Sequence, residues 1–160
     1  MIPRGAVARG LAAGVVGTAA MTLWQEALAR LKDGGAAPAG GDPWESAPAP
    51  AKVARRILAG VFGVEVPAER IGLLTHATHW AYGTSWGAAY GVVQESVRAR
   101  PAVHGPLFGA AVWATSYVQL VPMGIYGPPW RYSPRELAED LSYHLVYGAG
   151  VAAAHAVLEP

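Results

Sequence analysis

The sequence contains no cysteine, which excludes disulfide bonds, thiolate metal sites, iron–sulfur clusters and cysteine nucleophiles. Charged residues are also scarce, at 14% of the chain against 52% hydrophobic residues, well below the charged share of a typical soluble protein. The net charge is +1 and no long basic run occurs, so nothing predicts nucleic-acid binding. No H-E-x-x-H zinc-protease motif occurs either, and we do not predict an enzyme.

The scarce charges are segregated, and they leave four uncharged runs between them. The second run, Ile71 to Gln94, has 24 residues between Arg70 and Glu95, and as a helix it would be roughly 36 Å long, enough to cross a bilayer. The sequence therefore predicts an all-α polytopic membrane protein, a four-transmembrane-helix bundle forming one domain over residues 1–160. We expect spans at about 6–29, 71–94, 104–126 and 137–158.

The first run is the shortest, with 16 residues between Arg9 and Glu26. It also fits a signal peptide, since Arg4 and Arg9 would form the positive region and Ala27-Leu28-Ala29 a cleavage site. We favour an uncleaved span because several further spans follow.

The first loop, residues 33–69, is rich in glycine and proline and contains a short basic amphipathic helix, AKVARRILAGVF. Such a helix either lies in the lipid headgroup region or covers the mouth of the bundle as a soluble helix. Ser133 to Glu136 reads as a capping box that begins the fourth span, and Pro122 should kink or end the third helix near residues 119–121. Because the long first loop and the loop at Pro128 carry more Lys and Arg than the opposite side, the positive-inside rule places both termini outside the cytoplasm.

Glycines recur at four-residue intervals in three of the expected spans, a pattern typical of close helix packing. They are Gly10 and Gly14; Gly83, Gly87 and Gly91; and Gly105 and Gly109.

Six polar side chains should share the half of the membrane nearer the long loop, because successive spans run in opposite directions. They are Glu26, His76, His79, Gln119, Asp140 and His144. Intramembrane polar groups are costly unless they pair, so the cluster should face the bundle interior. It could be a hydrogen-bonded lock between helices, a proton or ion path, or a metal or haem site.

The candidate metal ligands are His76, His79, His144 and Asp140, but the pattern is loose, and we predict no cofactor.

Four stretches resemble a family of small, uncharacterised bacterial four-span membrane proteins: GDPWESAPAP, THWAYGTSWGAAYG, VPMGIYGPPWRY and LAEDLSYHLVYGAG. The most specific part is the D-L-S-x-H-L-V-Y-G run, Asp140 to Gly148. More distantly, the span layout is similar to that of the YagU-like inner-membrane proteins. The resemblance implies a four-helix membrane protein and draws attention to Asp140 and His144, and it brings no known reaction.

These features favour a small structural or accessory protein of the bacterial cytoplasmic (inner) membrane. A proton-linked or small-solute transporter is the alternative, and a metal- or haem-binding membrane protein is a further one. The expected partners are the lipid bilayer and, as a possibility, a second copy or another membrane protein.

Overall fold

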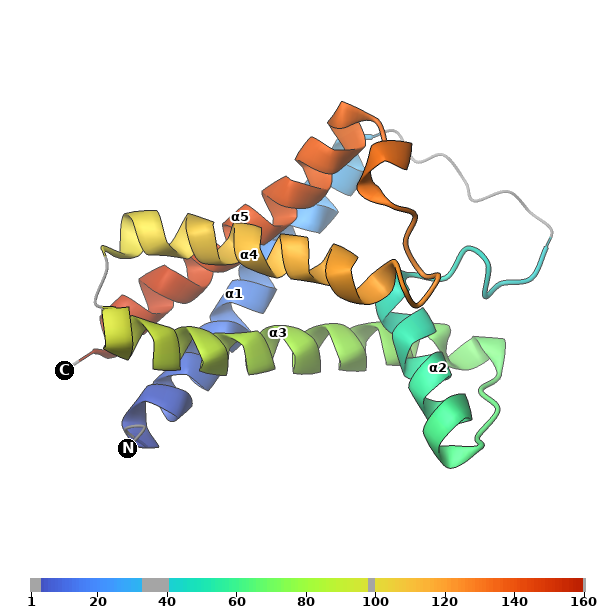
Figure 1. Ribbon diagram of the computed structural model, residues 1–160, viewed down its shortest axis with the longest axis horizontal. Helices are drawn as coiled ribbons and strands as arrows, with labels where there is room; N and C mark the ends of the chain where they lie inside the picture. The colour runs from blue at the N-terminus through green and yellow to red at the C-terminus, as the bar shows by residue number, and fades with distance from the viewer. Residues whose placement is uncertain (1–3, 33–40, 98–99, 160) are drawn as a thin grey trace.

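The computed structural model describes residues 4–32, 41–97 and 100–159, and this part of the chain is all helical, with no strand. The five α-helices, shown in Figure 1, are α1 (Arg4–Leu31), α2 (Ala49–Phe62), α3 (Ile71–Val97), α4 (Pro101–Leu120) and α5 (Pro134–Leu158). Two 3-10 turns, η1 (Ala68–Arg70) and η2 (Pro129–Arg131), precede α3 and α5. The predicted all-α fold is therefore confirmed. Parts of the predicted connections, residues 33–40 and 98–99, lie outside the described residues.

Helix α1 packs between α3 and α5, α4 packs on α5, and α2 packs against α3. The α1–α3 interface is made of backbone: a methyl group on Gly87 would overlap Gly14, and one on Gly91 would overlap Ala6 and Gly10. Only glycine allows two helix backbones to come this close.

The α4–α5 interface has the same character. A methyl group on Gly109 would overlap the backbone of His144, and one on Gly148 would overlap the backbone of Gly105 and Gly109.

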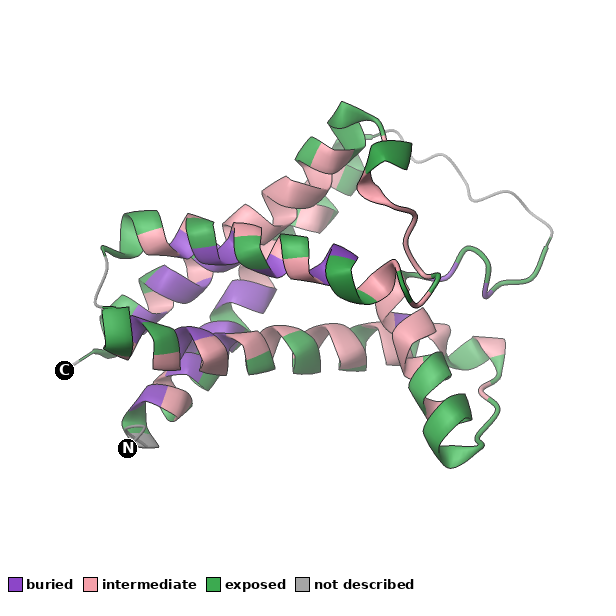
Figure 2. Ribbon diagram, viewed as in Figure 1, coloured by how far each residue is buried: buried purple, intermediate pink, exposed green. Residues whose placement is uncertain are grey.

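Helices α3 and α4 meet differently, through large side chains rather than through backbone. The ring of Phe108 lies edge-on to Tyr90, with centroids 5.0 Å apart, and edge-on to Trp86 at 6.1 Å. Buried residues gather in the half of the bundle nearer the two termini, as Figure 2 shows. The half nearer α2 is packed less tightly.

The predicted helix signals at two boundaries are confirmed. The Ser133 side chain accepts a hydrogen bond from the Glu136 amide, and the Glu136 carboxylate accepts one from the Ser133 amide. Helix α4 ends at Leu120, two residues before Pro122, which cannot donate a helical hydrogen bond. The third helix is therefore shorter than the predicted range of 104–126.

Two helical segments are long and apolar enough to cross a membrane by length and composition, Gly5–Leu31 and Pro134–Leu158. Helices α3 and α4 are long enough, but their mean hydropathy is lower than that of these two segments. They are rich in Trp, Tyr, His, Ser, Thr and Gly, although no charged residue occurs between Arg70 and Glu95 or within α4.

Candidate functional site

A cavity of about 220 Å³ lies between the helices in the half of the bundle nearer α2. Every α-helix contributes to its wall, and α2 covers it with Ala49, Pro50 and Val53. The polar or aromatic lining residues are Thr18, Gln25, Thr78, His79, Tyr82, Trp86, Ser116, Gln119, Tyr126, Asp140, His144 and Tyr147.

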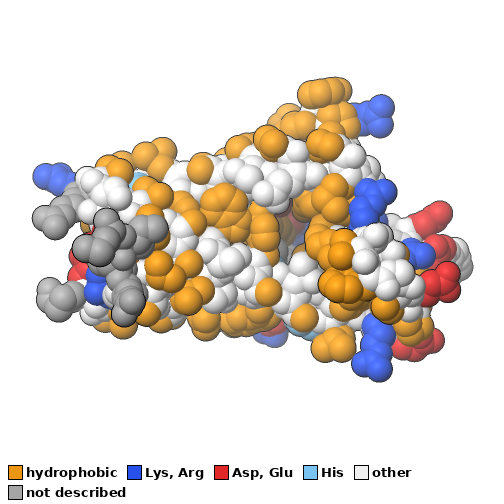
Figure 3. Space-filling model, turned by 60° about the horizontal axis from the view of Figure 1, so that its bottom comes forward, with side chains coloured by type: hydrophobic (Ala, Val, Ile, Leu, Met, Phe, Trp, Pro, Cys, Tyr) orange, Lys and Arg blue, Asp and Glu red, His pale blue; other side chains and the backbone are white. Residues whose placement is uncertain are grey.

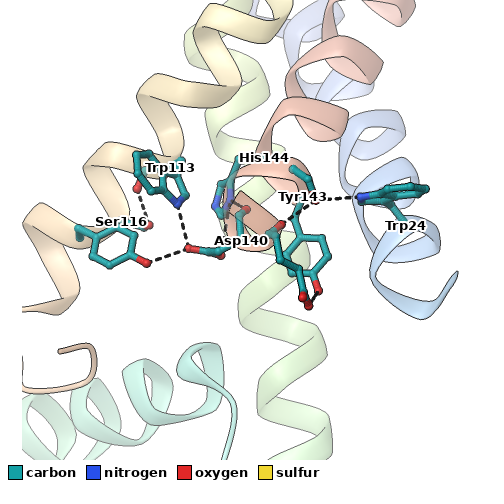
Figure 4. Close-up of polar contacts among 9 residues, drawn as sticks. Trp24, Trp113, Ser116, Asp140, Tyr143 and His144 are labelled. Carbon is teal, nitrogen blue, oxygen red and sulfur yellow. Dashed lines mark hydrogen bonds and ion pairs between the residues drawn. The ribbon is translucent and has the colours of Figure 1, made fainter. Parts of the chain in front are cut away.

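Asp140, in the second turn of α5, is the central polar group of the wall. Its Oδ2 accepts hydrogen bonds from Trp113 Nε1 at 2.9 Å and from the Tyr117 hydroxyl at 3.1 Å, both on α4 (Figure 4). Trp113 and Tyr117 are four residues apart and therefore project from the same face of α4. One carboxylate oxygen thus holds two helices together.

His144, one turn after Asp140, has a defined tautomer when neutral. Its Nδ1 lies 2.8 Å from the backbone carbonyl oxygen of Asp140, which can only accept, so Nδ1 carries the proton. The Nδ1 atom is also 3.9 Å from Asp140 Oδ1. The lone pair of the neutral ring therefore lies on Nε2.

His79, on α3, has the opposite tautomer. Its Nε2 lies 3.3 Å from the Thr22 hydroxyl, which itself donates to the Thr18 carbonyl at 2.9 Å. Because the hydroxyl proton is used there, Thr22 accepts from His79, and Nε2 carries the proton. This bond joins α1 to α3.

Three further hydrogen bonds join helix pairs in this half of the molecule. The Tyr147 hydroxyl of α5 donates to the Gly83 carbonyl of α3 at 2.6 Å. The Tyr82 hydroxyl of α3 donates to the Gln119 side chain of α4 at 2.9 Å. Trp24 Nε1 of α1 donates to the Ser142 hydroxyl of α5 at 3.0 Å, on the opposite side of α5 from Trp113 (Figure 4).

Four of the six residues in the predicted polar cluster line the one cavity: His79, Gln119, Asp140 and His144. The other two do not. Glu26 is exposed and lies 3.6 Å from Arg30 on its own helix. His76 is exposed on α3. It lies three residues before His79, and three residues turn a helix by about 300°, so the two side chains point in directions roughly 60° apart.

Within the described ranges, no three His, Asp or Glu side chains are grouped so that they could hold a metal ion. The predicted candidates were His76, His79, His144 and Asp140. His76 is exposed, whereas the other three line the cavity.

One sequence match to a catalytic motif has no catalytic setting. Residues 83–87, Gly-Thr-Ser-Trp-Gly, fit G-x-S-x-G, but that motif activates serine on a sharp turn between a strand and a helix. Ser85 lies within α3, and its hydroxyl donates to the carbonyl of Tyr82 at 2.8 Å. This serine is a helical surface residue.

The aromatic partners of Asp140 are not among the six predicted polar residues. The four-residue spacing of Trp113 and Tyr117, which places both on one face of a helix, was a usable signal.

A second polar group, at the end of the bundle that carries the termini, was also missed. Arg9 of α1 forms an ion pair with Glu95 of α3, and His104 of α4 is hydrogen-bonded to Gln94 of α3. The fully buried ring of Tyr90 lies between those of His104 and His155, with centroids 5.2 and 5.5 Å away. Arg9 directly precedes one uncharged run and Glu95 directly follows another, and both lie on the same side of the bundle. Their positions in the sequence could therefore have predicted the ion pair.

Comparison of the chain with protein-family models, curated proteins and solved structures found no match.

Proposed function

We propose that this chain is a four-span protein of the bacterial inner membrane, with α1, α3, α4 and α5 as spans. Its role is that of a small structural or accessory membrane protein whose interhelical hydrogen bonds hold the bundle around a cavity. The lipid bilayer is its first partner.

The observation that carries the proposal is the distribution of side-chain size. Large apolar residues point outward along the helices, as with Val16 at 49% exposure, Leu107 at 63% and Val118 at 73%. The α1–α3 and α4–α5 interfaces are instead made largely of glycine, with alanine and threonine beside it. A water-soluble bundle gains stability by burying its large apolar side chains, whereas lipid offers no such gain and favours small residues at helix interfaces.

The positions of the charges support the same placement. Charged side chains gather at the two ends of the molecule, and the surface between them is mainly apolar on the face shown in Figure 3. Helix α4 has no charged residue, and α3 has none before Glu95. Charged ends with long uncharged stretches of α3 and α4 between them fit a bilayer core with two aqueous surfaces.

Helix α2 suits the membrane interface. It crosses α3 at a steep angle at one end of the bundle (Figure 1), so it would lie along the membrane surface if α3 spans it. Ile57 and Val61 are exposed on one face, and Arg55 and Arg56 are exposed on another. This is the arrangement of an interfacial amphipathic helix.

The hydrogen bonds between helices in the half of the bundle nearer α2 support the accessory role. Asp140 joins α5 to α4, Tyr147 joins α5 to α3, and Thr22 joins α1 to α3. Such bonds contribute specificity where the hydrophobic effect does not draw helices together.

A second candidate function, a small-solute or proton-linked transporter, is favoured by the cavity itself. Its wall carries an ionisable carboxylate and two imidazoles in the half of the bundle nearer α2. Such groups are typical of solute and proton pathways in membrane proteins.

Labelling of single cysteines tests the four-span proposal, because the native chain has none. The exposed residues Ser46, Ser96 and Arg131 lie in or beside the three connections between the proposed spans. Each would be replaced by cysteine in turn and treated in intact cells with a membrane-impermeant maleimide. Four spans place Ser46 and Arg131 on one side and Ser96 on the other. If only α1 and α5 span, all three share one side, and the proposal is wrong.

A further inference from the structure

The wall of the cavity has a single formal charge. Among its described lining residues, Asp140 is the only acid, and there is no lysine or arginine. In a wall of this composition the carboxylate sets the sign of the local potential, and a carboxylate that is only about 26% exposed favours a positive partner.

The free hydrogen-bonding capacity near Asp140 consists of acceptors. Oδ2 already accepts two hydrogen bonds, whereas no hydrogen bond from the described residues reaches Oδ1. His144 uses its Nδ1 proton on a backbone carbonyl, so its Nε2 is an acceptor as well. A ligand that binds to Oδ1 must bring a hydrogen-bond donor, and an ammonium brings the positive charge as well.

The remaining wall suits a cation with an apolar body. Tyr82, Trp86, Tyr126 and Tyr147 line the cavity together with Met21 and Val112. Aromatic faces attract ammonium groups, and the attraction grows when water is excluded.

The volume limits the size of such a ligand. An engineered apolar cavity of about 150 Å³ in another protein holds one benzene molecule. At about 220 Å³, this cavity has room for one six-membered ring with a short amine arm.

We propose that the cavity binds a small primary amine in its ammonium form, with Asp140 as the counter-ion and the aromatic wall around the apolar body. This site deepens the solute-binding candidate above, since it names the class of solute, and it rests on the bundle being folded as described. The ammonium would donate to Asp140 Oδ1.

The test is calorimetric titration of the purified full chain in detergent micelles. The probes are methylamine, benzylamine and cyclohexylmethylamine, with benzyl alcohol as the uncharged match for benzylamine. We expect saturable one-to-one binding of benzylamine, at least tenfold weaker binding of benzyl alcohol, and weak binding of methylamine, which leaves the apolar wall uncovered.

Two substitutions and a control test the assignment of the counter-ion. Asp140→Asn keeps an oxygen that can accept from Trp113 and Tyr117 but removes the charge, and it should weaken benzylamine binding at least tenfold. Glu139→Gln removes the neighbouring acid, which pairs with Lys32 and does not line the cavity, and it should leave binding unchanged.

The second substitution, Val53→Trp, fills the cavity from α2 without touching the carboxylate and should also abolish binding. It keeps the proposal testable if Asp140→Asn does not fold.

Three results would overturn the proposal: no saturable binding of any of the three amines, equal binding of benzyl alcohol and benzylamine, or undiminished binding by a folded Asp140→Asn or by Val53→Trp. None of these bears on the number of spans, which the cysteine labelling decides separately.

Discussion

Replacing Gly87 by alanine should separate two helices that now touch through their backbones. A Cβ at this position would lie 2.6 Å from the Gly14 amide nitrogen, whereas ordinary van der Waals contact begins near 3.4 Å. The obstructing atoms belong to the α1 backbone, which cannot rotate away as a side chain would. Helix α1 must therefore move by most of an ångström, and the contacts along this interface loosen with it.

The expected magnitude combines two opposing effects. Forcing a methyl group into a filled interface costs typically about 1–3 kcal/mol, and a rigid backbone neighbour places Gly87 at the upper end. Alanine regains about 1 kcal/mol of helix propensity over glycine. We expect Gly87→Ala to lower the free energy of unfolding by about 2 kcal/mol.

The same helix offers a matched control in Gly72, where a Cβ would meet nothing within 4 Å. Gly72→Ala should raise the free energy of unfolding by up to about 1 kcal/mol, because only the propensity gain remains. Both variants would be unfolded with denaturant in mild detergent and followed by far-ultraviolet circular dichroism. Equal stabilisation of the two variants would refute the backbone-contact argument.

Three other predictions test single interactions. Tyr147→Phe removes the hydrogen bond to the Gly83 carbonyl and should lower the free energy of unfolding by about 1 kcal/mol in the same assay; no change would mean that lipid or water replaces the bond. Glu95→Gln should lower the free energy of unfolding by about 1–2 kcal/mol, a value discounted because the side chains of its ion pair with Arg9 are about one quarter exposed. The double variant with Arg9→Gln should lose less stability than the sum of the losses in the two single variants. Arg56→Gln should reduce the anionic lipid retained through purification, measured by mass spectrometry, by roughly fivefold, since each basic residue near an anionic surface contributes about 1 kcal/mol; retention equal to that of the native chain would place α2 away from the headgroups.

Depth along each helix could be predicted from the sequence, because the rise per residue is constant and the spans alternate in direction. This reasoning predicted that His79, Gln119, Asp140 and His144 share one half of the bundle, and all four line one cavity in the structure.

Rotation about each helix axis could not be predicted in the same way. It depends on crossing angles set by the glycine contacts, and a shift of one residue turns a side chain by about 100°. Glu26 had the right depth, but it lies on the outer surface of α1 beside Arg30.

The partners of Asp140 illustrate a second limit. A tryptophan in an apolar run is ordinarily read as packing, and its N–H becomes informative only when an acceptor lies opposite it. The hydrogen bond from Trp113 to Asp140 depends on α4 and α5 lying side by side, and the sequence does not give that arrangement.

The position of α1 between α3 and α5 has a consequence for biosynthesis. Helix α1 has two packing partners, α3 and α5, and α5 is made after α3 and α4. The two faces of α1 therefore meet their partners at different times: Gly14 meets Gly87 once α3 has been made, whereas Gly17 meets Val151 only once α5 has been made. Contacts between distant parts of a chain form late. A chain that stops before α5 leaves α1 without one of its two partners and α4 without its glycine-lined neighbour, so the bundle can close only after α5 has been made.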